Sequence, residues 1–288
     1  MRIYDPNQAT LTALRGSDIE LIVDVPNVDL PSLQSAAGAA NWVQTNVRPH
    51  FPATKIRIIA VGNEVDPEKQ ETSRYAGLVL PAMQNIYTAL SLFNLQDEIK
   101  VSTATYSAVL KDTYPPSNST FKDSSFMAPI IRFLAETRAP LLANIYPYFA
   151  YIGDEARSIK LPYALFTAEE VVVRDGGLEY RNLFDAMVDG VYSAVEKTGG
   201  GGGKGVEVVV SESGWPSHGG AAASMENAGA YYRNLMNHVE KGTPKRPGKS
   251  TETYLFAMFD ENQKPGATTE QHFGLFYPNK EMKYQVKF

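Results

Sequence analysis

Seven short apolar runs, separated by longer amphipathic stretches, constrain the fold of this chain more than any other feature. Each run is apolar at consecutive positions, which is typical of strands buried on both faces of a parallel sheet. The seven predicted strands are Met1–Asp5, Ile19–Pro26, Ile56–Gly62, Ile99–Thr105, Leu141–Tyr146, Val206–Val210 and Tyr254–Phe259. Strands that alternate with helices indicate an α/β protein built on a parallel sheet.

The stretches between these runs carry helical periodicity. In three of them apolar side chains recur three and four positions apart, as they do along the buried face of a helix. The predicted helices span Tyr75–Leu90, with Pro81 as a kink, Phe126–Leu134 and Met225–Val239. No Gly-x-Gly-x-x-Gly sequence follows a predicted strand, so a barrel is a better interpretation than an open dinucleotide-binding sheet.

Two segments interrupt the alternation. Tyr163–Val173 is predicted to be a hairpin-like insertion, and its first part, Tyr163–Thr167, is a weak candidate for an eighth strand. The glycine run Gly199–Gly203 predicts a flexible loop. Lys204 follows the glycines, but the run precedes a strand and no Ser or Thr follows the lysine, which disfavours a phosphate-binding loop.

Composition excludes several classes of function. The 288 residues carry a net charge of −5 without a basic cluster, which disfavours nucleic acid as a partner. No apolar stretch approaches the roughly 18 residues of a membrane helix. Cysteine is absent, so thiol catalysis and cysteine-ligated metals are excluded. The four histidines lack metal-ligand spacing. We therefore expect no metal, no cofactor, no nucleic acid and no membrane partner.

The N-terminal segment begins directly on a predicted strand. Met1–Pro6 lacks the basic and apolar regions of a secretory signal, so the chain is interpreted as a mature protein or a fragment. One glycosylation sequon, Asn118–Thr120, lies in a loop rich in Pro and Ser. This sequon is weak support for secretion.

Three of the predicted strands end on a carboxylate. Glu64 follows Ile56–Gly62, Glu212 follows Val206–Val210, and Glu261 follows the last strand. In a (β/α) barrel these strand ends form the catalytic face, where an unpaired charge is costly. The structural alternative is pairing with Lys or Arg, or capping of a helix. Converging carboxylates predict glycoside hydrolysis, which needs one proton donor and a second carboxylate as nucleophile or base.

Aromatic side chains lie beside several of these strand ends. Their flat rings can stack on sugar faces, although most aromatic residues in any chain belong to the core. The candidates are Tyr4, Tyr146, Tyr148, Phe149 and Trp215. A serine hydrolase is disfavoured because the chain has no Gly-x-Ser-x-Gly sequence.

These segments resemble the plant endo-1,3-β-glucanases of glycoside hydrolase family 17. Val206–Ser217 is similar to the family signature, and the likeness extends over essentially the whole chain. It includes Met1–Asn7, Val61–Glu64, Ala143–Tyr148, Phe256–Asn262 and Phe273–Phe276. The resemblance implies a (β/α)8 TIM barrel in one domain, 1–288, with a small extra subdomain inserted at about residues 150–185.

Carried over residue by residue, the resemblance implies a retaining mechanism with Glu212 as nucleophile and Glu64 as acid/base. Glu64 then has to remain protonated and Glu212 ionised. The predicted substrate-binding residues are Tyr4, Asn63, Asn144, Tyr146, Phe149, Trp215, Glu261, Lys264 and Glu270.

The likeness has one departure. Family members carry a further strand and helix, about thirty residues, before the segment that begins here. On that pattern Met1–Asp5 is the second barrel strand, Glu64 ends the fourth and Glu212 ends the seventh. We therefore expect this chain to lack the first β/α unit, and Met1–Asp5 not to pair with Tyr254–Phe259.

The leading hypothesis is a monomeric endo-hydrolase of 1,3-β-glucan polysaccharide, such as callose, laminarin or fungal wall glucan. The resemblance implies a secreted or vacuolar, pathogenesis-related protein of plant defence. Two alternatives stay open: a 1,3;1,4-β-glucanase of the same family, and a non-catalytic glucan-binding protein on the same scaffold.

Overall fold

The computed structural model of the chain describes residues 1–155, 157–198 and 202–286. Part of the predicted glycine loop, residues 199–201, lies outside these ranges. The chain separates into two compact units, which are described one at a time. Unit 1 comprises Met1–Lys111, Phe121–Ala143 and Ala194–Val208, and unit 2 comprises Asp112–Thr120, Asn144–Ser193 and Val209–Phe288.

Seven strands are hydrogen-bonded in the order β1-β2-β3-β4-β7-β10-β11. They are β1 (Arg2–Ile3), β2 (Glu20–Val25), β3 (Lys55–Asn63), β4 (Lys100–Tyr106), β7 (Leu141–Asn144), β10 (Val208–Ser213) and β11 (Thr253–Leu255). Each overlaps one predicted strand, so those predictions are confirmed. The ladders β1–β2, β2–β3, β3–β4 and β10–β11 are parallel. As expected, β1 and β11 are not neighbours but the two ends of the order.

Two of the strands differ in extent from the prediction. β10 starts two residues later than expected and continues through Ser213, so that Glu212 belongs to the strand itself. β11 ends at Leu255 instead of Phe259. Beyond Leu255 the chain pairs with the C-terminal segment instead, since the backbone N–H of Ala257 donates to the carbonyl oxygen of Phe273.

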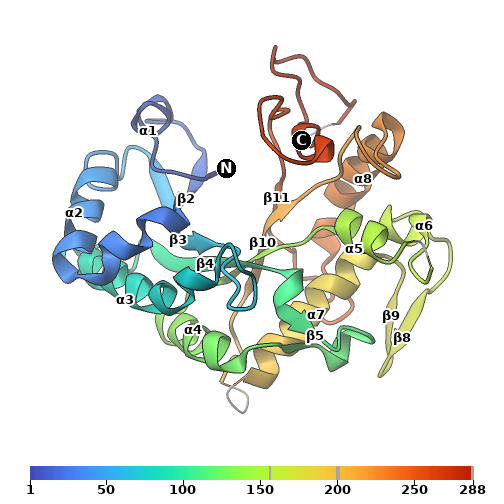
Figure 1. Cartoon of the computed structure of the whole chain (residues 1–288), viewed down its shortest axis with the longest axis horizontal. Helices are drawn as coiled ribbons and strands as arrows, with labels where there is room; N and C mark the ends of the chain where they lie inside the picture. The colour runs from blue at the N-terminus through green and yellow to red at the C-terminus, as the bar shows by residue number, and fades with distance from the viewer. Residues whose placement is uncertain (156, 199–201, 287–288) are drawn as a thin grey trace. The chain divides into compact units, whose positions relative to one another are not determined.

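Helices of unit 1 pack on its strands (Figure 1). α3 contacts β3 and β4, and α4 contacts β4 and α3. The buried face of α3 includes Val79, Met83, Ile86 and Leu90, four of the six apolar positions predicted for this helix, and Pro81 lies inside it. The elements are α1 (Gln8–Ala13), η1 (Asn27–Gln34), α2 (Ala36–Asn46), η2 (Ser73–Tyr75), α3 (Ala76–Leu92), η3 (Ser107–Val109), β5 (Leu110–Lys111) and α4 (Ser124–Thr137). β5 pairs with β6 (Thr120–Phe121) in a separate two-stranded sheet.

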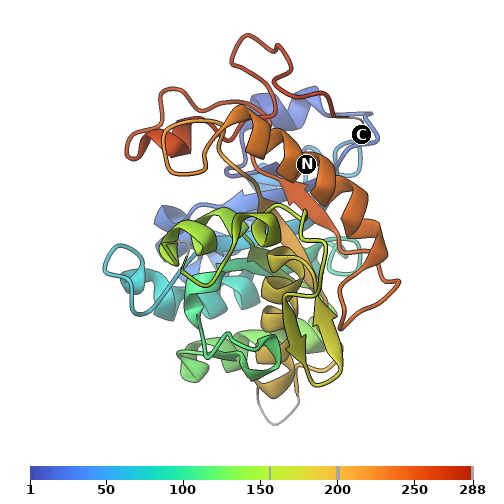
Figure 2. The same ribbon diagram turned by 90° about the vertical axis from the view of Figure 1, so that its right-hand side faces the viewer.

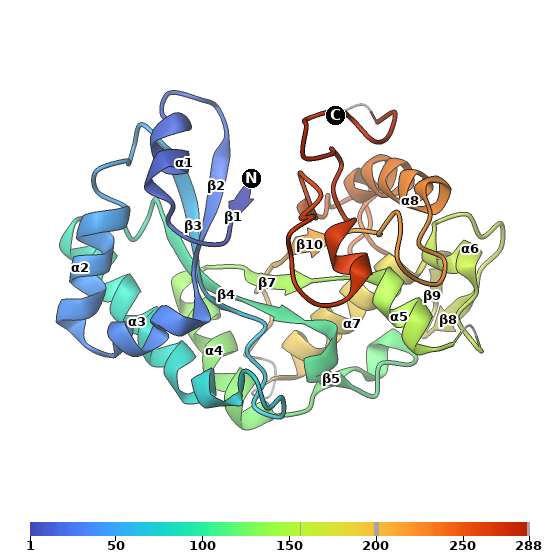
Figure 3. The ribbon, with the colours of Figure 1, turned by 45° about the horizontal axis from the view of Figure 1, so that its top comes forward.

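Unit 2 holds the remaining helices. In it α5 and α6 contact each other (Figure 3). α8 buries three of the predicted apolar positions, Ala228, Tyr232 and Leu235, whereas Met225 is exposed and Val239 lies beyond the helix. It is capped by Ser224, whose hydroxyl oxygen accepts from the backbone N–H of Asn227 at 3.1 Å. The elements are η4 (Pro116–Asn118), α5 (Pro147–Gly153), α6 (Leu161–Ala164), α7 (Leu183–Lys197, continuing into unit 1), α8 (Met225–His238), η6 (Val239–Lys241) and η7 (Thr268–Gln271).

The hairpin expected at Tyr163–Val173 is wrong in position. That segment begins within the short helix α6, where Pro162 occupies the first turn. The antiparallel hairpin follows it, as β8 (Val173–Asp175) and β9 (Leu178–Tyr180), beside α7 (Figure 2). Its turn is Gly176–Gly177, and both residues have positive φ, which glycine adopts without steric cost. Among the described residues, no helix is long and apolar enough to cross a membrane.

Candidate active site

Glu64, in unit 1, leaves β3 in a left-handed backbone conformation with φ of 50°. Its backbone N–H donates to the carbonyl oxygen of Ala104 in β4 at 2.8 Å. A residue with a side chain is uncommon in this region and persists only where the surrounding structure holds it there. The fold therefore sets the direction in which the Glu64 side chain leaves the strand.

The residue before it, Asn63, is held by the side chain of Asn27. Asn27 Nδ2 donates to the carbonyl oxygen of Asn63 at 2.8 Å, and the Asn63 N–H donates to Asn27 Oδ1 at 2.9 Å. Gly62 allows this approach, since a Cβ there would lie 3.1 Å from Asn27 Oδ1. Its φ of 78° is also one that glycine adopts readily.

A buried ion pair contacts Asn63. Arg2 Nη2 donates to Asp24 Oδ2 at 2.7 Å and to Asn63 Oδ1 at 2.9 Å, and Arg2 Nε donates to Asp24 Oδ1 at 3.1 Å. The guanidinium carbon lies 4.7 Å from the ring centroid of Tyr4, which is 43% exposed. The sequence interpretation missed Arg2 and Asp24. The available signal was the charge of Asp24 within the apolar run Ile19–Pro26, because a buried charge requires a partner.

Glu212, in unit 2, lies near the end of β10 and is 6% exposed. The hydroxyl of Tyr146 donates to Glu212 Oε2 at 2.7 Å. The backbone carbonyl of Glu212 accepts from the N–H of Ile145 at 2.8 Å. The segment that follows β7 therefore positions both the backbone and the carboxylate of Glu212.

Gly214 permits a close approach of the chain that follows β11. A Cβ at this position would lie 2.1 Å from the carbonyl oxygen of Phe256 and 3.0 Å from the hydroxyl of Tyr232. That hydroxyl lies 2.6 Å from the carbonyl oxygen of Phe256 and 2.7 Å from that of Phe273. Complete burial raises the pKa of Tyr232 well above its ordinary value, so the hydroxyl remains a donor.

Two predicted substrate-binding residues of unit 2 lie in the core instead. Trp215 is 0% exposed, its Nε1–H donates to the carbonyl of Ala222 at 2.9 Å, and its ring packs against Tyr148. Asn144 is 1% exposed and its Oδ1 accepts from the hydroxyl of Ser211 at 2.8 Å. Stacking of Trp215 on a sugar is therefore corrected to a structural role, and Asn144 supports the strand that carries Glu212.

Phe149 is an exposed aromatic residue of unit 2. It is 39% exposed, and its ring packs at 5.3 Å from both Tyr146 and Tyr148 and at 5.9 Å from Phe273. Tyr148 itself is buried. The supporting rings hold Phe149 in a fixed orientation, as an aromatic platform for a sugar requires.

Glu261, Lys264 and Glu270 form one cluster. Lys264 Nζ lies 3.0 Å from Glu261 Oε2 and 3.1 Å from Glu270 Oε2. The ammonium also lies 5.2 Å from the ring centroid of Phe256. Burial acts to lower the pKa of Lys264, but hydrogen bonds to the two glutamates outweigh it and the pKa is raised. Lys264 therefore remains a cation, and the three residues predicted for the cleft come together.

A second charged pair of unit 2 was missed from the sequence. The Lys283 side chain is 1% exposed, and its ammonium donates to Asp260 Oδ1 at 2.7 Å and to Ser217 Oγ at 2.8 Å. Asp260 directly precedes Glu261, and Ser217 lies five residues after Glu212. Lys283 therefore joins the segments that carry two predicted site residues.

Carboxylates at or beyond the ends of parallel strands, accompanied by exposed aromatic rings, are typical of glycoside hydrolases built on an α/β barrel. The family model for glycosyl hydrolases family 17 matches residues 1–288, and the chain belongs to this family. This result confirms the resemblance that the sequence motifs indicated.

Named relatives and solved structures agree with this membership. A glucan endo-1,3-β-glucosidase of Vitis vinifera is 61% identical over 291 residues, covering 100% of this chain and 83% of the relative. The structure of CJP38, a β-1,3-glucanase and allergen of Cryptomeria japonica pollen, superposes with a TM-score of 0.95 at 49% identity, covering 100% and 89% of the two chains. One of two plant β-glucan endohydrolases with distinct substrate specificities superposes with a TM-score of 0.92 at 46% identity, covering 100% and 90%. The expected barrel fold class is thereby confirmed.

Proposed function

We propose that this chain is a retaining endo-hydrolase of 1,3-β-D-glucosidic linkages, with Glu212 as the nucleophile and Glu64 as the acid/base. The observation that carries the proposal is the buried carboxylate of Glu212 on β10, oriented by the Tyr146 hydroxyl at 2.7 Å. The β-1,3-glucanase activity named for similar proteins supports the choice of linkage.

The proposed reaction has two steps. First, the Glu212 carboxylate attacks the anomeric carbon, the glycosidic C–O bond breaks, and the proton of Glu64 passes to the leaving oxygen. Then Glu64 takes a proton from water, the water oxygen bonds to the anomeric carbon, and Glu212 is released as a carboxylate. This chemistry requires the two carboxyl groups to lie about 5–5.5 Å apart, a distance that a crystal structure would measure.

Exposed side chains supply the proposed sugar contacts. Phe149 and Tyr4 offer ring surface for stacking. Lys264, held between Glu261 and Glu270, orients these carboxylates so that they can accept hydrogen bonds from sugar hydroxyls. In unit 1, Arg2 Nη2 donates to Oδ1 of Asn63, which fixes the orientation of the Asn63 side chain.

Replacement of the nucleophile tests the proposal. Glu212→Gln removes the attacking charge and preserves volume, so release of reducing sugar from laminarin should fall at least about a thousandfold with Tm unchanged. The matched control is Glu207→Gln, an exposed glutamate just before the same strand, which should keep full activity. A Glu212→Gln enzyme with more than about a tenth of the wild-type rate would overturn the nucleophile assignment.

The stereochemical course gives an independent test. A retaining enzyme releases the β-anomer first, before mutarotation, and NMR of the earliest product detects it. An α-anomer as first product would show inversion and refute the two-step scheme.

Linkage preference is tested against the alternative of a 1,3;1,4-β-glucanase. One similar solved structure comes from a pair of plant endohydrolases with distinct specificities, which makes this comparison necessary. We expect a higher kcat/KM on laminarin than on mixed-linkage glucan. Binding of laminari-oligosaccharides without any product would instead indicate a non-catalytic glucan-binding protein.

The proposal extends to the setting in which the enzyme acts. We expect a monomer that meets its polysaccharide substrate outside the cell or in the vacuole. The exposed position of Asn118 in η4 makes its sequon accessible to glycosylation. Size-exclusion chromatography and the intact mass of the natural protein test these statements.

A further inference from the structure

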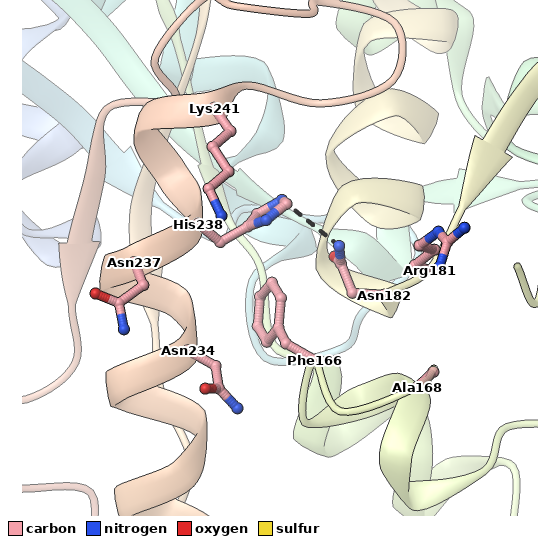
Figure 4. Close-up of a pocket in the computed structure, with 8 residues that line it drawn as sticks. All are labelled: Phe166, Ala168, Arg181, Asn182, Asn234, Asn237, His238 and Lys241. Carbon is pink, nitrogen blue, oxygen red and sulfur yellow. Dashed lines mark hydrogen bonds between the residues drawn. The ribbon is translucent and has the colours of Figure 1, made fainter. Parts of the chain in front are cut away.

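We propose that a pocket of unit 2, separate from the residues assigned to hydrolysis, binds a sugar-sized anion, namely a hydroxylated ring that carries a carboxylate or a phosphate. The pocket has a volume of about 300 Å³ and lies beside the C-terminal end of α8 (Figure 4). The lining side chains used in the argument are Phe166, Arg181, Asn234, Asn237, His238 and Lys241. We refer to this cavity as the α8 pocket.

The charges of the α8 pocket favour an anion. Of the described residues that line it, Arg181 and Lys241 are cationic and none is acidic, while the Asp185 carboxylate behind the wall is bound by His238. Arg181 Nη1 donates to the carbonyl oxygen of Glu169 at 2.7 Å, which anchors the guanidinium while its other N–H groups remain available as donors. Walls rich in cationic donors match a ligand rich in acceptor oxygens.

A buried network behind the α8 pocket orients one of its walls. His238 Nε2 lies 2.8 Å and 2.9 Å from the two carboxylate oxygens of the buried Asp185. Asn182 holds this carboxylate in turn, since its Nδ2 donates to Asp185 Oδ2 at 2.8 Å and its Oδ1 accepts from the Asp185 N–H at 2.8 Å. The imidazole is therefore fixed through Nε2, which donates to Asp185, and Nδ1 of the neutral ring is an acceptor that suits a hydroxyl of the ligand. The bond from the Asp185 N–H to Asn182 Oδ1 also caps the N-terminus of α7, so this network is part of the fold, and it fixes the orientation of His238.

The remaining walls suit a hydroxylated ring. Phe166 is half-buried and packs at 5.3 Å from the His238 ring and 5.7 Å from the Tyr231 ring, so its orientation is fixed. Asn234 Nδ2 donates to the carbonyl oxygen of Leu165 at 2.8 Å, which leaves Oδ1 to accept from a ligand hydroxyl. The exposed amide of Asn237 adds both a donor and an acceptor. The volume is at the lower end of the range for small-molecule pockets, which fits a single sugar ring.

Calorimetric titration of the whole chain tests the proposal. The probes are glucuronate and glucose 6-phosphate, with glucose and inorganic phosphate as the neutral and ring-free comparisons, all at one ionic strength. We expect saturable one-site binding of at least one anionic sugar, at least fivefold tighter than both comparisons. Which of the two binds more tightly distinguishes a carboxylate ligand from a phosphate ligand.

Two matched variants locate the binding. Lys241→Gln removes one exposed cation of the α8 pocket and should weaken binding of the anionic sugar at least fivefold. Lys111→Gln removes an exposed cation in unit 1 and should leave it unchanged. Both variants should hydrolyse laminarin at the wild-type rate. Because binding is measured by calorimetry and not by hydrolysis, failure of the hydrolase assignment would not affect this test.

A spectroscopic readout is independent of affinity. In NMR titrations the ring signals of His238 should move with the same saturation curve as the calorimetric binding, and those of His50 should not. The proposal is overturned by the absence of saturable binding, by equal affinity for glucose or for inorganic phosphate alone, by equal weakening in the two lysine variants, or by unmoved His238 signals.

Discussion

Replacement of Lys283 by methionine removes one partner of a buried ion pair and should destabilise unit 2. Lys283 Nζ donates to Asp260 Oδ1 at 2.7 Å, to Ser217 Oγ at 2.8 Å and to the carbonyl oxygen of His272 at 3.3 Å. Burial lowers the pKa of Lys283, a desolvation effect that the contact with Asp260 opposes. Methionine keeps the length of the side chain but supplies no charge, so Asp260 remains buried without its cation.

The expected loss in the free energy of unfolding depends on the hydrogen bonds that Asp260 keeps. Breaking a buried ion pair from one side costs about 3–5 kcal/mol. Gly274 N–H still donates to Asp260 Oδ1 at 2.8 Å, which favours the lower end of that range. With an unfolding entropy of about 2.1 cal/mol/K per residue over 288 residues, about 3 kcal/mol corresponds to a fall in Tm of about 5 °C.

Differential scanning calorimetry measures this loss, and a double-mutant cycle assigns it. In Asp260→Asn/Lys283→Met no buried charge is left unpaired, so this variant should be at least about 1 kcal/mol more stable than Lys283→Met alone. The matched control, Lys280→Met, replaces an exposed lysine of the same segment and should shift Tm by less than about 1 °C. A Lys283→Met protein within about 2 °C of wild type, or a double variant no more stable than the single one, would refute the reasoning.

Three further outcomes are expected. Tyr146→Phe removes the hydroxyl that donates to Glu212 and should lower kcat on laminarin at least about tenfold at unchanged Tm, and a change below twofold would contradict the positioning role. Lys264→Met leaves Glu261 and Glu270 without their shared cation and should raise KM for laminari-oligosaccharides while changing Tm little. An unchanged KM would show that this cluster does not contact the substrate. Burial raises the pKa of Asp189 to about 6, from 3.8. The native state therefore keeps this proton to a higher pH than the unfolded chain does, and the protonated carboxyl contributes stability at low pH. This contribution is lost as the pH rises from about 4 through about 6. The Tm of wild type minus that of Asp189→Asn should therefore fall between about pH 4 and pH 7, and a flat difference would exclude the effect.

The order of elements could be predicted because buried strands and helix faces leave strong patterns. The seven apolar runs each became a strand, and the stripe in Ala76–Leu92 became the buried face of α3. Boundaries were less predictable, since strand length depends on the partner. Val208–Ser213 extends through Glu212 because β11 and β7 continue beside it, and no local signal encodes that neighbour.

Site residues could be predicted where they belong to a sequence motif. They could not be predicted where their role depends on contacts between segments that are distant in the sequence. Lys283 lies far along the chain from Ser217, so nothing in the sequence links them. Trp215 belongs to the signature segment, yet its burial follows from packing against Tyr148, which periodicity does not reveal. The hairpin lies ten residues further along the chain than expected because its turn is set by Gly176–Gly177, where both residues have positive φ.

The hydrogen bonds that fix the end of β3 have a consequence for how the enzyme loses activity in denaturant. The backbone around Glu64 is fixed by Asn27 on one side and by Ala104 on the other, and both contacts join segments remote in the chain. Local opening confined to the end of β3, where these contacts lie, would release Glu64 while the strands stay paired. Mild denaturant would then inactivate the enzyme before circular dichroism registers unfolding, and removal of the denaturant would restore activity as quickly as these contacts re-form.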